Sequence, residues 1–233
     1  MNIQQNKILA CLPAHELKLW ESQLELVYLN ADTDVIDFNQ NMNFIYFPIA
    51  VIFSLTTVMQ NGGVADYALI GNEGLVGVLN LLGGYSKFNS ISVQTAGAAY
   101  RINIDFVINE FNKSSSFNRL VLRYVHSLII HAAQTSACNR HHTIMQQLCR
   151  ALLLNHDRHI DDKLQLTQEQ LSKILGVRRE GVGDAAIKLQ SEGIIRYSRG
   201  IISILDRKRL EACSCECYQI VKNEYARLMA SEL

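Results

Sequence analysis

Apolar and polar residues change their spacing several times along this chain of 233 residues. Residues 5–20 place apolar side chains at helical spacing, which predicts an N-terminal helix. From residue 24 to residue 104 the pattern becomes a series of short runs rich in Val, Ile, Tyr and Phe, and turn residues separate the runs. Eight of the 13 glycines lie between residues 62 and 97. Short strands with Gly-rich turns are typical of a small β-sandwich or barrel, so we expect one here.

A long helix is predicted to follow the β region. Neither Gly nor Pro occurs from Phe117 to Cys138. The apolar positions fall into two neighbouring stripes, which indicates that the helix packs against two partners, its own β region and a symmetry mate. We expect the dimer interface to contain Phe117, Leu120, Tyr124 and His131.

Residues 166–189 carry the pattern of a helix-turn-helix. Thr167, with Gln170 three residues later, forms a capping box that opens a first helix. Gly176 stands where a tight turn ends this helix, and a second helix begins with the polar run 178–180. Two alternating runs then flank the turn Ser198-Arg199-Gly200, which predicts a β-hairpin wing directly after the second helix.

The start of the second helix has residue types that read bases. The first residues of a recognition helix reach base edges in the major groove. Arg can bind guanine with two hydrogen bonds and Glu can accept one from cytosine, so Arg179 and Glu180 are candidates for reading a G·C pair. Arg199 at the tip of the wing is a candidate phosphate contact. The full set of expected DNA contacts is Thr167, Gln168, Arg178, Arg179, Glu180, Gly183, Asp184, Lys188, Ser198 and Arg199.

Composition and charge agree with a globular protein that has a DNA-binding helix-turn-helix. The chain is 48% hydrophobic and 19% charged, which is ordinary for a globular protein and excludes a disordered one. Its net charge is zero, but residues 163–209 hold ten Lys and Arg against five Asp and Glu. The basic charge is therefore concentrated on the predicted helix-turn-helix, as expected for a surface that faces nucleic acid.

Several of these features occur together in one known family. The segment around Leu12-Pro13, the Gly-rich β region, the long helix and the sequence Arg179-Glu180-x-Val182-Gly183 follow in the order found in the Crp/Fnr transcription regulators, and the chain resembles that family along nearly its whole length. The resemblance implies an α+β fold with an N-terminal double-stranded β-roll like those that bind cyclic nucleotides, a long dimerisation helix and a C-terminal winged helix-turn-helix. We place these parts at residues 1–113, 114–138 and 139–233.

The resemblance also implies partners. Members of this kind are homodimers that bind palindromic double-stranded DNA and regulate transcription, and RNA polymerase is a further candidate partner. The sequence has neither a signal-peptide pattern nor an apolar stretch of the roughly 20 residues that cross a membrane, so we expect a cytoplasmic protein without a membrane partner.

An effector pocket is expected in the β-roll, although its residues differ from those that bind cyclic AMP. Where cyclic-AMP-binding members have a Glu for the ribose, this chain has Asn72, with Glu73 displaced by one position. Lys87 and Phe88 replace the Arg-Ser/Thr pair that binds phosphate, and a Lys cannot form the planar two-point clamp of an Arg. We therefore expect an effector other than cyclic AMP, or none. The pocket candidates are Gly71, Asn72, Glu73, Gly74, Lys87, Phe88 and Gln134.

The six cysteines are expected to be reduced thiols. Three of them, Cys213, Cys215 and Cys217, stand close together near the C-terminus. On one helix Cys213 and Cys217 share a face and Cys215 points elsewhere, so a single helix supplies at most two of the four ligands of a structural zinc site. We therefore assign no metal and no cofactor. Packing of the last helix is the preferred role, and metal or redox sensing remains open.

An alternative function is a ligand- or metal-dependent β-barrel enzyme with a helical tail. Such an enzyme needs ligands inside its strands, yet the sequence has no His between residues 16 and 125, and only Asp66, Glu73 and Lys87 are available there. We therefore assign no catalytic residue and prefer the regulator. A regulator whose β-roll is only a ligand-free scaffold remains open.

Overall fold

The computed structural model describes residues 2–36, 42–60, 63–83, 89–113, 116–159 and 162–230. The chain divides into two compact units. The first comprises residues 1–56, 69–129 and 224–233, and the second comprises residues 57–68 and 130–223. The long helix α5 (Ser116–His141) contributes to both units.

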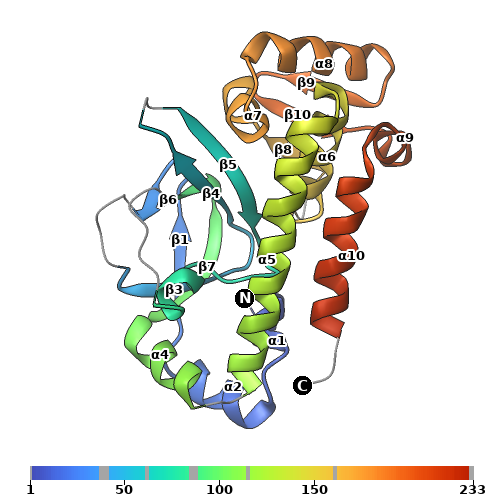
Figure 1. Cartoon of the computed structure of the whole chain (residues 1–233). Coiled ribbons are helices and arrows are strands. Elements are labelled where there is room, and N and C mark those ends of the chain that lie inside the picture. Colours follow the sequence, from blue (N-terminus) through green and yellow to red (C-terminus); the bar gives the residue numbers. More distant parts are fainter. Residues whose placement is uncertain are drawn as a thin grey trace. The chain divides into compact units, whose positions relative to one another are not determined.

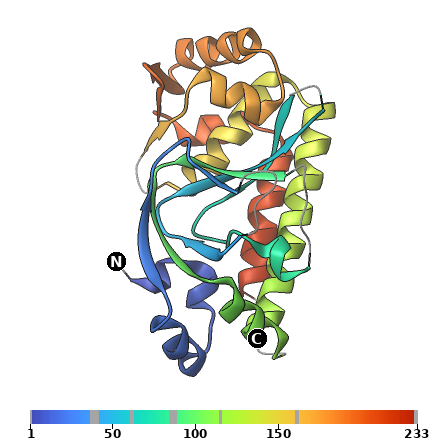
Figure 2. The ribbon, with the colours of Figure 1, turned by 90° about the vertical axis from the view of Figure 1, so that its left-hand side faces the viewer.

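The β region, most of which belongs to the first unit, consists of two β-sheets (Figures 1 and 2). The three-stranded antiparallel sheet has the order β1-β7-β3, and the four-stranded sheet has the order β2-β6-β4-β5. The strands are β1 (Glu25–Leu29), β2 (Asp34–Ile36), β3 (Phe44–Pro48), β4 (Ile52–Val58), β5 (Val64–Ile70), β6 (Asn89–Thr95) and β7 (Gly97–Asn103). These strands and the helices that follow confirm the predicted α+β fold.

A glycine at the start of β7 lets two segments of this β region cross closely. A Cβ atom at Gly97 would come within 2.5 Å of the backbone nitrogen of Val51 and within 2.6 Å of the carbonyl carbon of Ala50. Neither neighbour is a flexible side chain, so only glycine fits at this position.

Short helices cover one end of these sheets (Figure 2). They are η1 (Ile3–Gln5), α1 (Lys7–Ala10), α2 (Ala14–Glu21), α3 (Val78–Leu81) and α4 (Ile104–Asn112). The single helix predicted for residues 5–20 is wrong, because Pro13 lacks a backbone N–H and stands as the N-cap of α2, where the helical path is interrupted. Trp20 in α2 is fully buried, and its ring centroid lies 5.8 Å from Phe47 and 4.6 Å from Phe117. The first turn of α5 is therefore anchored in the core of this unit.

A buried asparagine connects the N-terminal segment to the sheets. Asn6 is inaccessible to solvent, and its side-chain oxygen accepts hydrogen bonds from the backbone N–H groups of Ile8 and Leu9 at the start of α1. Its amide nitrogen donates to the carbonyl oxygens of Pro48 and Gly74 at 3.0 and 2.9 Å. One polar side chain thus satisfies four buried backbone groups.

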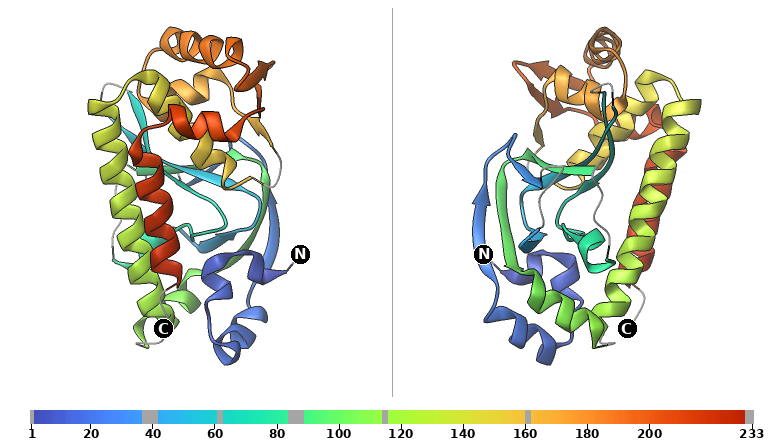
Figure 3. Two further views of the ribbon diagram at one scale, coloured as in Figure 1. Left: turned by 90° about the vertical axis from the view of Figure 1, so that its right-hand side faces the viewer. Right: turned by 60° about the vertical axis from the view of Figure 1, so that its left-hand side comes forward.

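The second unit holds the helices and the small sheet of the C-terminal region. Its elements are α6 (Ile144–His156), β8 (Lys163–Gln165), α7 (Gln168–Leu175), α8 (Arg179–Ser191), β9 (Ile195–Ser198), β10 (Ile201–Ile204), α9 (Arg207–Cys213) and the first part of α10 (Glu216–Ala230). Helix α6 contacts α7, α8 and α9, and the buried side chains of Leu148, Leu152, Leu171 and Leu189 form their shared core. Helix α10 runs alongside α5 (Figures 1 and 3). None of the helices formed by the described residues combines the length and apolar character needed to cross a membrane.

Three basic side chains are buried together in the second unit. His131 on α5 is 2% exposed, and Arg150 and Arg158 are also buried. Arg150 donates to Thr135 Oγ1 at 2.8 Å, and Arg158 donates to the carbonyl oxygen of Leu154 at 2.7 Å. Burial, with the charges of Arg158 and Arg150, holds the pKa of His131 well below its ordinary value of 6.5. His131 is therefore neutral in the folded chain at neutral pH.

We expect Asn6→Ala to lower the free energy of unfolding by about 2–4 kcal/mol. The change removes a helix cap worth about 1 kcal/mol and leaves buried carbonyls unsatisfied at about 1–3 kcal/mol. Trp20 is the only tryptophan of the chain and lies in the same unit, so urea unfolding followed by its fluorescence measures the effect. Asn2→Ala is the control, because Asn2 caps η1 while exposed to solvent. Equal losses for the two variants would contradict the role of Asn6.

Acidification is expected to destabilise the second unit through His131. Below a pH of about 6.5 the unfolded chain binds a proton that the folded chain excludes, so stability falls by up to about 1.4 kcal/mol per pH unit. His131→Gln cannot bind that proton and is expected to lose less stability than the parent between a pH of about 7.5 and 5.5. Urea unfolding followed by circular dichroism at both pH values tests this. The exposed His126→Gln should behave as the parent does, and equal losses in all three proteins would refute the assignment to His131.

Candidate nucleic-acid interface

The predicted helix-turn-helix is confirmed at α7 and α8. Thr167 caps α7, with its hydroxyl accepting from Gln170 N–H and the Gln170 side chain accepting from Thr167 N–H at 2.9 Å. Gly176 ends α7 with φ +63°, a left-handed conformation that a glycine adopts without steric cost. Arg178 is the N-cap of α8, so the polar run identified in the sequence lies at the N-terminus of this helix.

The predicted wing is also confirmed. Strands β9 and β10 pair antiparallel, and Ser198 and Ile201 flank the tip. The two tip residues, Arg199 and Gly200, have φ of +49° and +78°, as in the two-residue turns that suit β-hairpins. The carbonyl oxygen of Gly200 accepts a hydrogen bond from Leu166 N–H at 2.9 Å, which holds the wing tip close to the start of α7.

Residues from three elements meet in one hollow of about 440 Å³. Its lining consists of Thr167, Gln168, Arg179, Tyr197, Arg199 and Gly200. Arg179 Nε donates to Gln168 Oε1 at 3.3 Å, so the start of α7 orients an arginine of α8. The structure thus brings together four of the ten predicted DNA contacts at the junction of α7, α8 and the wing.

Sequence reasoning missed Tyr197 at this junction. Its backbone N–H donates to the side-chain oxygen of Gln190 on α8 at 2.7 Å, so the wing is tied to the recognition helix. Burial raises the pKa of the Tyr197 hydroxyl, although nearby Arg179 opposes this shift. The alternation of apolar and polar residues in the wing could have indicated the position of Tyr197, because it places Tyr197 opposite Ile202 in the hairpin.

The other predicted contacts lie on or beside the outer surface of α8 and the wing. Arg178, Glu180, Asp184, Lys188 and Ser198 are exposed, and Gly183 is half-buried near Gln168. Neither Arg178 nor Arg199 forms an ion pair with any residue that the structure describes, so both guanidinium groups are available for an anion. Ile187 is 67% exposed on the same helix and was not among the predicted contacts.

Of the predicted effector residues, the structure places only Gly71–Gly74 together in one segment. Gly71–Gly74 form a turn after β5, and the Glu73 carboxylate accepts a hydrogen bond from Gly71 N–H at 3.2 Å. Gly74 packs so closely on the ring of Tyr124 that a Cβ atom would overlap it. Gln134 lies on the part of α5 that belongs to the second unit, and Lys87 and Phe88 lie outside the described residues.

The predicted dimer residues on α5 are buried within the single chain. Phe117, Leu120 and Tyr124 are at most 1% exposed because they already pack in the first unit, and His131 is 2% exposed. A side chain covered by its own chain offers no surface to a second copy. The exposed apolar residues of α5 are Leu122 and Ile129, at 50% and 62% exposure and seven positions apart. That spacing puts them on one face of the helix.

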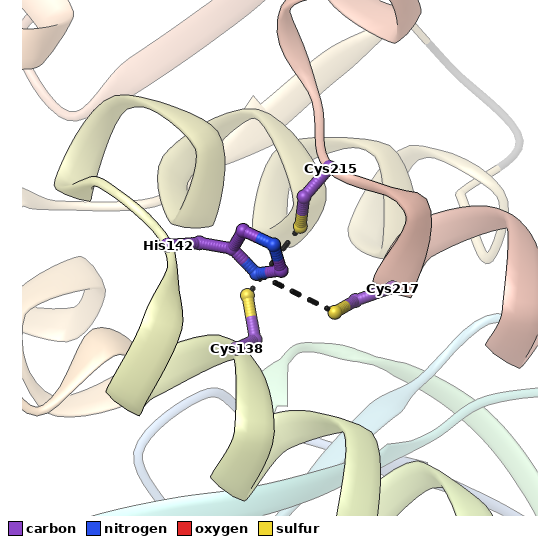
Figure 4. Close-up of side chains that lie close together, drawn as sticks. All are labelled: Cys138, His142, Cys215 and Cys217. Atoms are coloured by element: carbon purple, nitrogen blue, oxygen red, sulfur yellow. Dashed lines mark hydrogen bonds between the residues drawn. The ribbon is translucent and has the colours of Figure 1, made fainter.

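The cysteines near the C-terminus are not on one helix, which corrects the prediction that Cys213 and Cys217 share a helix face. Helix α9 ends at Cys213, and α10 begins at Glu216. This break turns Cys215 and Cys217 toward Cys138 at the end of α5 (Figure 4). Burial raises the pKa of the Cys217 thiol to about 11, with a further increase from neighbouring Cys215.

Comparison with known proteins agrees with this architecture. Residues 146–213 match the Crp-like helix-turn-helix domain. FixK2 from Bradyrhizobium japonicum is similar in structure with a TM-score of 0.70 at 15% identity, over 82% of this chain and 98% of FixK2. A putative transcriptional regulator of the Crp/Fnr family from Eubacterium rectale has a TM-score of 0.65 at 17% identity, over 90% of this chain and 98% of that protein. The c-di-GMP-responsive global regulator CLP from Xanthomonas campestris has a TM-score of 0.63 at 14% identity, over 82% of this chain and 99% of CLP.

A comparison with curated protein sequences gives no match. The matched domain runs from α6 to the end of α9 and contains every predicted DNA contact. The solved structures share the fold of most of the chain. The Crp-like helix-turn-helix domain supports the prediction of a DNA-binding regulator over the alternative of a β-barrel enzyme. The chain therefore contains a Crp-like helix-turn-helix domain and shares the fold of solved transcription regulators of the Crp/Fnr kind.

Proposed function

We propose that this regulator is a homodimer that reads a palindromic DNA sequence with the start of α8, and that its N-terminal β region senses something other than cyclic AMP. The observation that carries the first part is the convergence of Gln168, Arg179 and Arg199 on one hollow. These three side chains come from α7, α8 and the wing. Their convergence gives one surface that can contact both bases and phosphates.

Direct reading of bases falls to Arg179 and Glu180. The N-terminus of α8 enters the major groove, where Arg179 pairs with guanine and Glu180 accepts from the amino group of cytosine. The hydrogen bond from Arg179 to Gln168 fixes the direction of the guanidinium before DNA arrives, which reduces the entropy lost on binding. Asp184 lies one turn further along α8, and its negative charge repels phosphate, so the operator offers a base edge there.

Phosphate contacts then set the register of the protein on the duplex. Arg199 at the wing tip and Arg178 at the N-cap of α8 are exposed and form no ion pair within the described residues. Free guanidinium groups bind phosphate oxygens with two hydrogen bonds each. The positive end of the α8 dipole adds to the attraction for the anionic backbone.

Two copies associate through the exposed face of α5. Leu122 and Ile129 are the large apolar side chains that α5 leaves exposed, and a second α5 buries them by symmetry. A two-fold dimer places its recognition helices about 34 Å apart, one turn of DNA, on the two halves of a palindrome.

The turn at Gly71–Gly74 supports an effector other than cyclic AMP. Glu73 is only 6% exposed, and its carboxylate is bound to the backbone of its own turn. It is therefore not presented to a ribose, and Asn72 replaces the Glu that holds the ribose in cyclic-AMP-binding members. A screen of nucleotides and metabolites by thermal shift identifies the effector, and a panel without any stabilising compound favours a ligand-free scaffold.

Selection of bound duplexes from a random DNA pool tests the proposal as a whole. Purified protein at a salt concentration of about 0.1 M is expected to enrich an inverted repeat with half-sites one turn apart. Binding without enrichment would show that α8 does not read bases. Absence of binding that is reversed by small molecules from a cell extract would show that the effector is required.

Substitutions in α8 and the wing are expected to have different effects. Glu180→Ala should cost about 1–3 kcal/mol on the selected sequence and relax the choice at one base pair of each half-site. Arg199→Ala should weaken binding to all sequences alike and lower the slope of log K against log salt by about one unit. Titrations on selected and scrambled duplexes at several salt concentrations measure both effects. Glu192→Ala, at the far end of α8, is the control, and equal losses on both duplexes for Glu180→Ala would contradict base reading.

A charge on the exposed face of α5 is expected to separate the dimer. Leu122→Asp or Ile129→Asp would place a carboxylate in an apolar interface, where burial of an unpaired charge is strongly unfavourable. Analytical ultracentrifugation should then show a monomer, with affinity for the full palindrome reduced to that for a half-site. Leu19→Asp is the control, since Leu19 is 49% exposed on α2. A dimer that persists in both α5 variants would place the interface elsewhere.

A further inference from the structure

Four side chains with metal-binding atoms converge in the second unit (Figure 4). Cys138 lies in the last turn of α5, and His142 directly follows that helix. Cys215 directly precedes α10, and Cys217 lies in its first turn. One ligand atom from each side chain lies within 4.8 Å of the other three. Two of the separations are 3.5 Å from Cys138 Sγ to Cys215 Sγ and 3.6 Å from Cys217 Sγ to His142 Nδ1.

These separations fit a single tetrahedral ion. Bonds of about 2.3 Å from zinc to sulfur and about 2.0–2.1 Å to nitrogen place two sulfurs about 3.8 Å apart and a sulfur and a nitrogen about 3.6 Å apart. An iron–sulfur cluster spreads its ligands over several iron atoms and so needs wider spacing than one ion. Three cysteines and one histidine form a donor set that is typical of structural zinc.

The imidazole of His142 is already turned for this role. Its Nε2 lies 3.3 Å from the Glu216 carboxylate, and its Nδ1 faces the sulfur of Cys217. Histidines that bind metals through one nitrogen usually donate the N–H of the other nitrogen to a carboxylate, which fixes the tautomer. Glu216 is therefore a positioning residue for the cluster.

A buried cation beside the cluster supports an anionic complex. Arg150 is 5% exposed, donates to Thr135 Oγ1, and forms no ion pair with any carboxylate of the described residues. Its Nε is buried without a hydrogen-bond partner. Burial lowers the pKa of the Arg150 guanidinium, and the neighbouring Cys138 and Cys217 oppose that shift. Three thiolates and one neutral imidazole around Zn²⁺ carry a net charge of −1, which the guanidinium of Arg150 balances.

The backbone at the end of α5 is fixed in the geometry that the ligands need. His142 N–H donates to the carbonyl oxygen of Cys138 at 3.0 Å, and the side chain of Gln147 donates to the carbonyl oxygens of Cys138 and His142. The three cysteines are buried at 0%, 6% and 2% exposure. The ligand atoms are thus preorganised and shielded from water.

We infer that Cys138, His142, Cys215 and Cys217 form a binding site for one zinc ion. In the binding step Zn²⁺ replaces the thiol protons of the three cysteines, and four metal–ligand bonds form as three protons are released to solvent. No electron is transferred. Because protons compete with the ion, affinity for zinc falls as the pH is lowered.

The site joins the two chain segments that enter and leave the DNA-binding domain. The matched helix-turn-helix domain, residues 146–213, lies between the ligands of α5 and those of α10. A bound ion closes this stretch of chain into a loop, which stabilises the fold by reducing the entropy of the unfolded chain. The ion thereby fixes how α5 continues into the domain that contacts DNA.

Metal analysis of the full-length protein tests the inference, with matched cysteine variants. Protein purified in the presence of zinc and then passed through a desalting column is expected to retain one zinc per chain, and Co²⁺ in its place should give the visible absorption of a tetrahedral thiolate site. Cys138→Ser and Cys217→Ser should lose the retained zinc and the cobalt spectrum. Cys213→Ser is the control, because it removes a thiol from the same Cys-x-Cys-x-Cys run but from outside the cluster. Glu216→Gln should keep the spectrum and weaken zinc binding by about 10–100-fold.

Other results would overturn the inference. Zinc that is lost on the column, or equal losses in Cys213→Ser and Cys217→Ser, would exclude the site. A Cys138–Cys215 disulfide in freshly prepared protein would assign the cluster to redox chemistry, and iron with acid-labile sulfide would assign it to an iron–sulfur cluster. Circular dichroism of each variant separates loss of zinc from loss of fold. All these measurements are made without DNA, so their outcome is independent of whether α8 reads bases.

Discussion

The structure depends on the continuity of one helix. An α-helix repeats every 3.6 residues, so each side chain of the 26-residue helix α5 has a fixed direction once any one of them is placed. Burial of Phe117 against Trp20 sets these side-chain directions at the first turn. The same helix turns Leu122 and Ile129 to solvent, and Cys138 in its last turn is one of the proposed metal ligands. One continuous helix therefore carries core residues of the first unit, the proposed dimer face and part of the proposed metal site.

Features that depend on local chemistry could be predicted from the sequence. The capping box of Thr167 with Gln170, the left-handed Gly176 and the turn at Arg199-Gly200 each need only a few neighbouring residues, and each occurs in the structure as predicted. The strand runs between residues 24 and 104 were found for the same reason, since their alternation and their turns are local signals. The α+β fold and the DNA-binding surface follow from these parts.

Features that depend on contacts between distant residues could not be predicted in this way. Both stripes of α5 are apolar, and only the position of Trp20, about a hundred residues earlier in the sequence, decides which stripe is buried. Cys138 and Cys215 are 77 residues apart, and nothing near either one indicates the other. Nothing in the sequence around Asn6 distinguishes it from a surface polar residue, although its side chain donates hydrogen bonds to the carbonyl oxygens of Pro48 and Gly74 in the core. Each of these depends on tertiary packing, which a single sequence does not display.

The tip of the wing has a consequence for the evolution of this protein. A left-handed conformation costs an arginine about 1–2 kcal/mol relative to glycine, and Arg199 adopts it with φ +49°. The free protein would therefore be more stable with glycine or asparagine at this position. In the proposed function, a guanidinium at the tip of this hairpin reaches a phosphate that a shorter side chain cannot. The requirements of folding and of DNA affinity then act in opposite directions at Arg199.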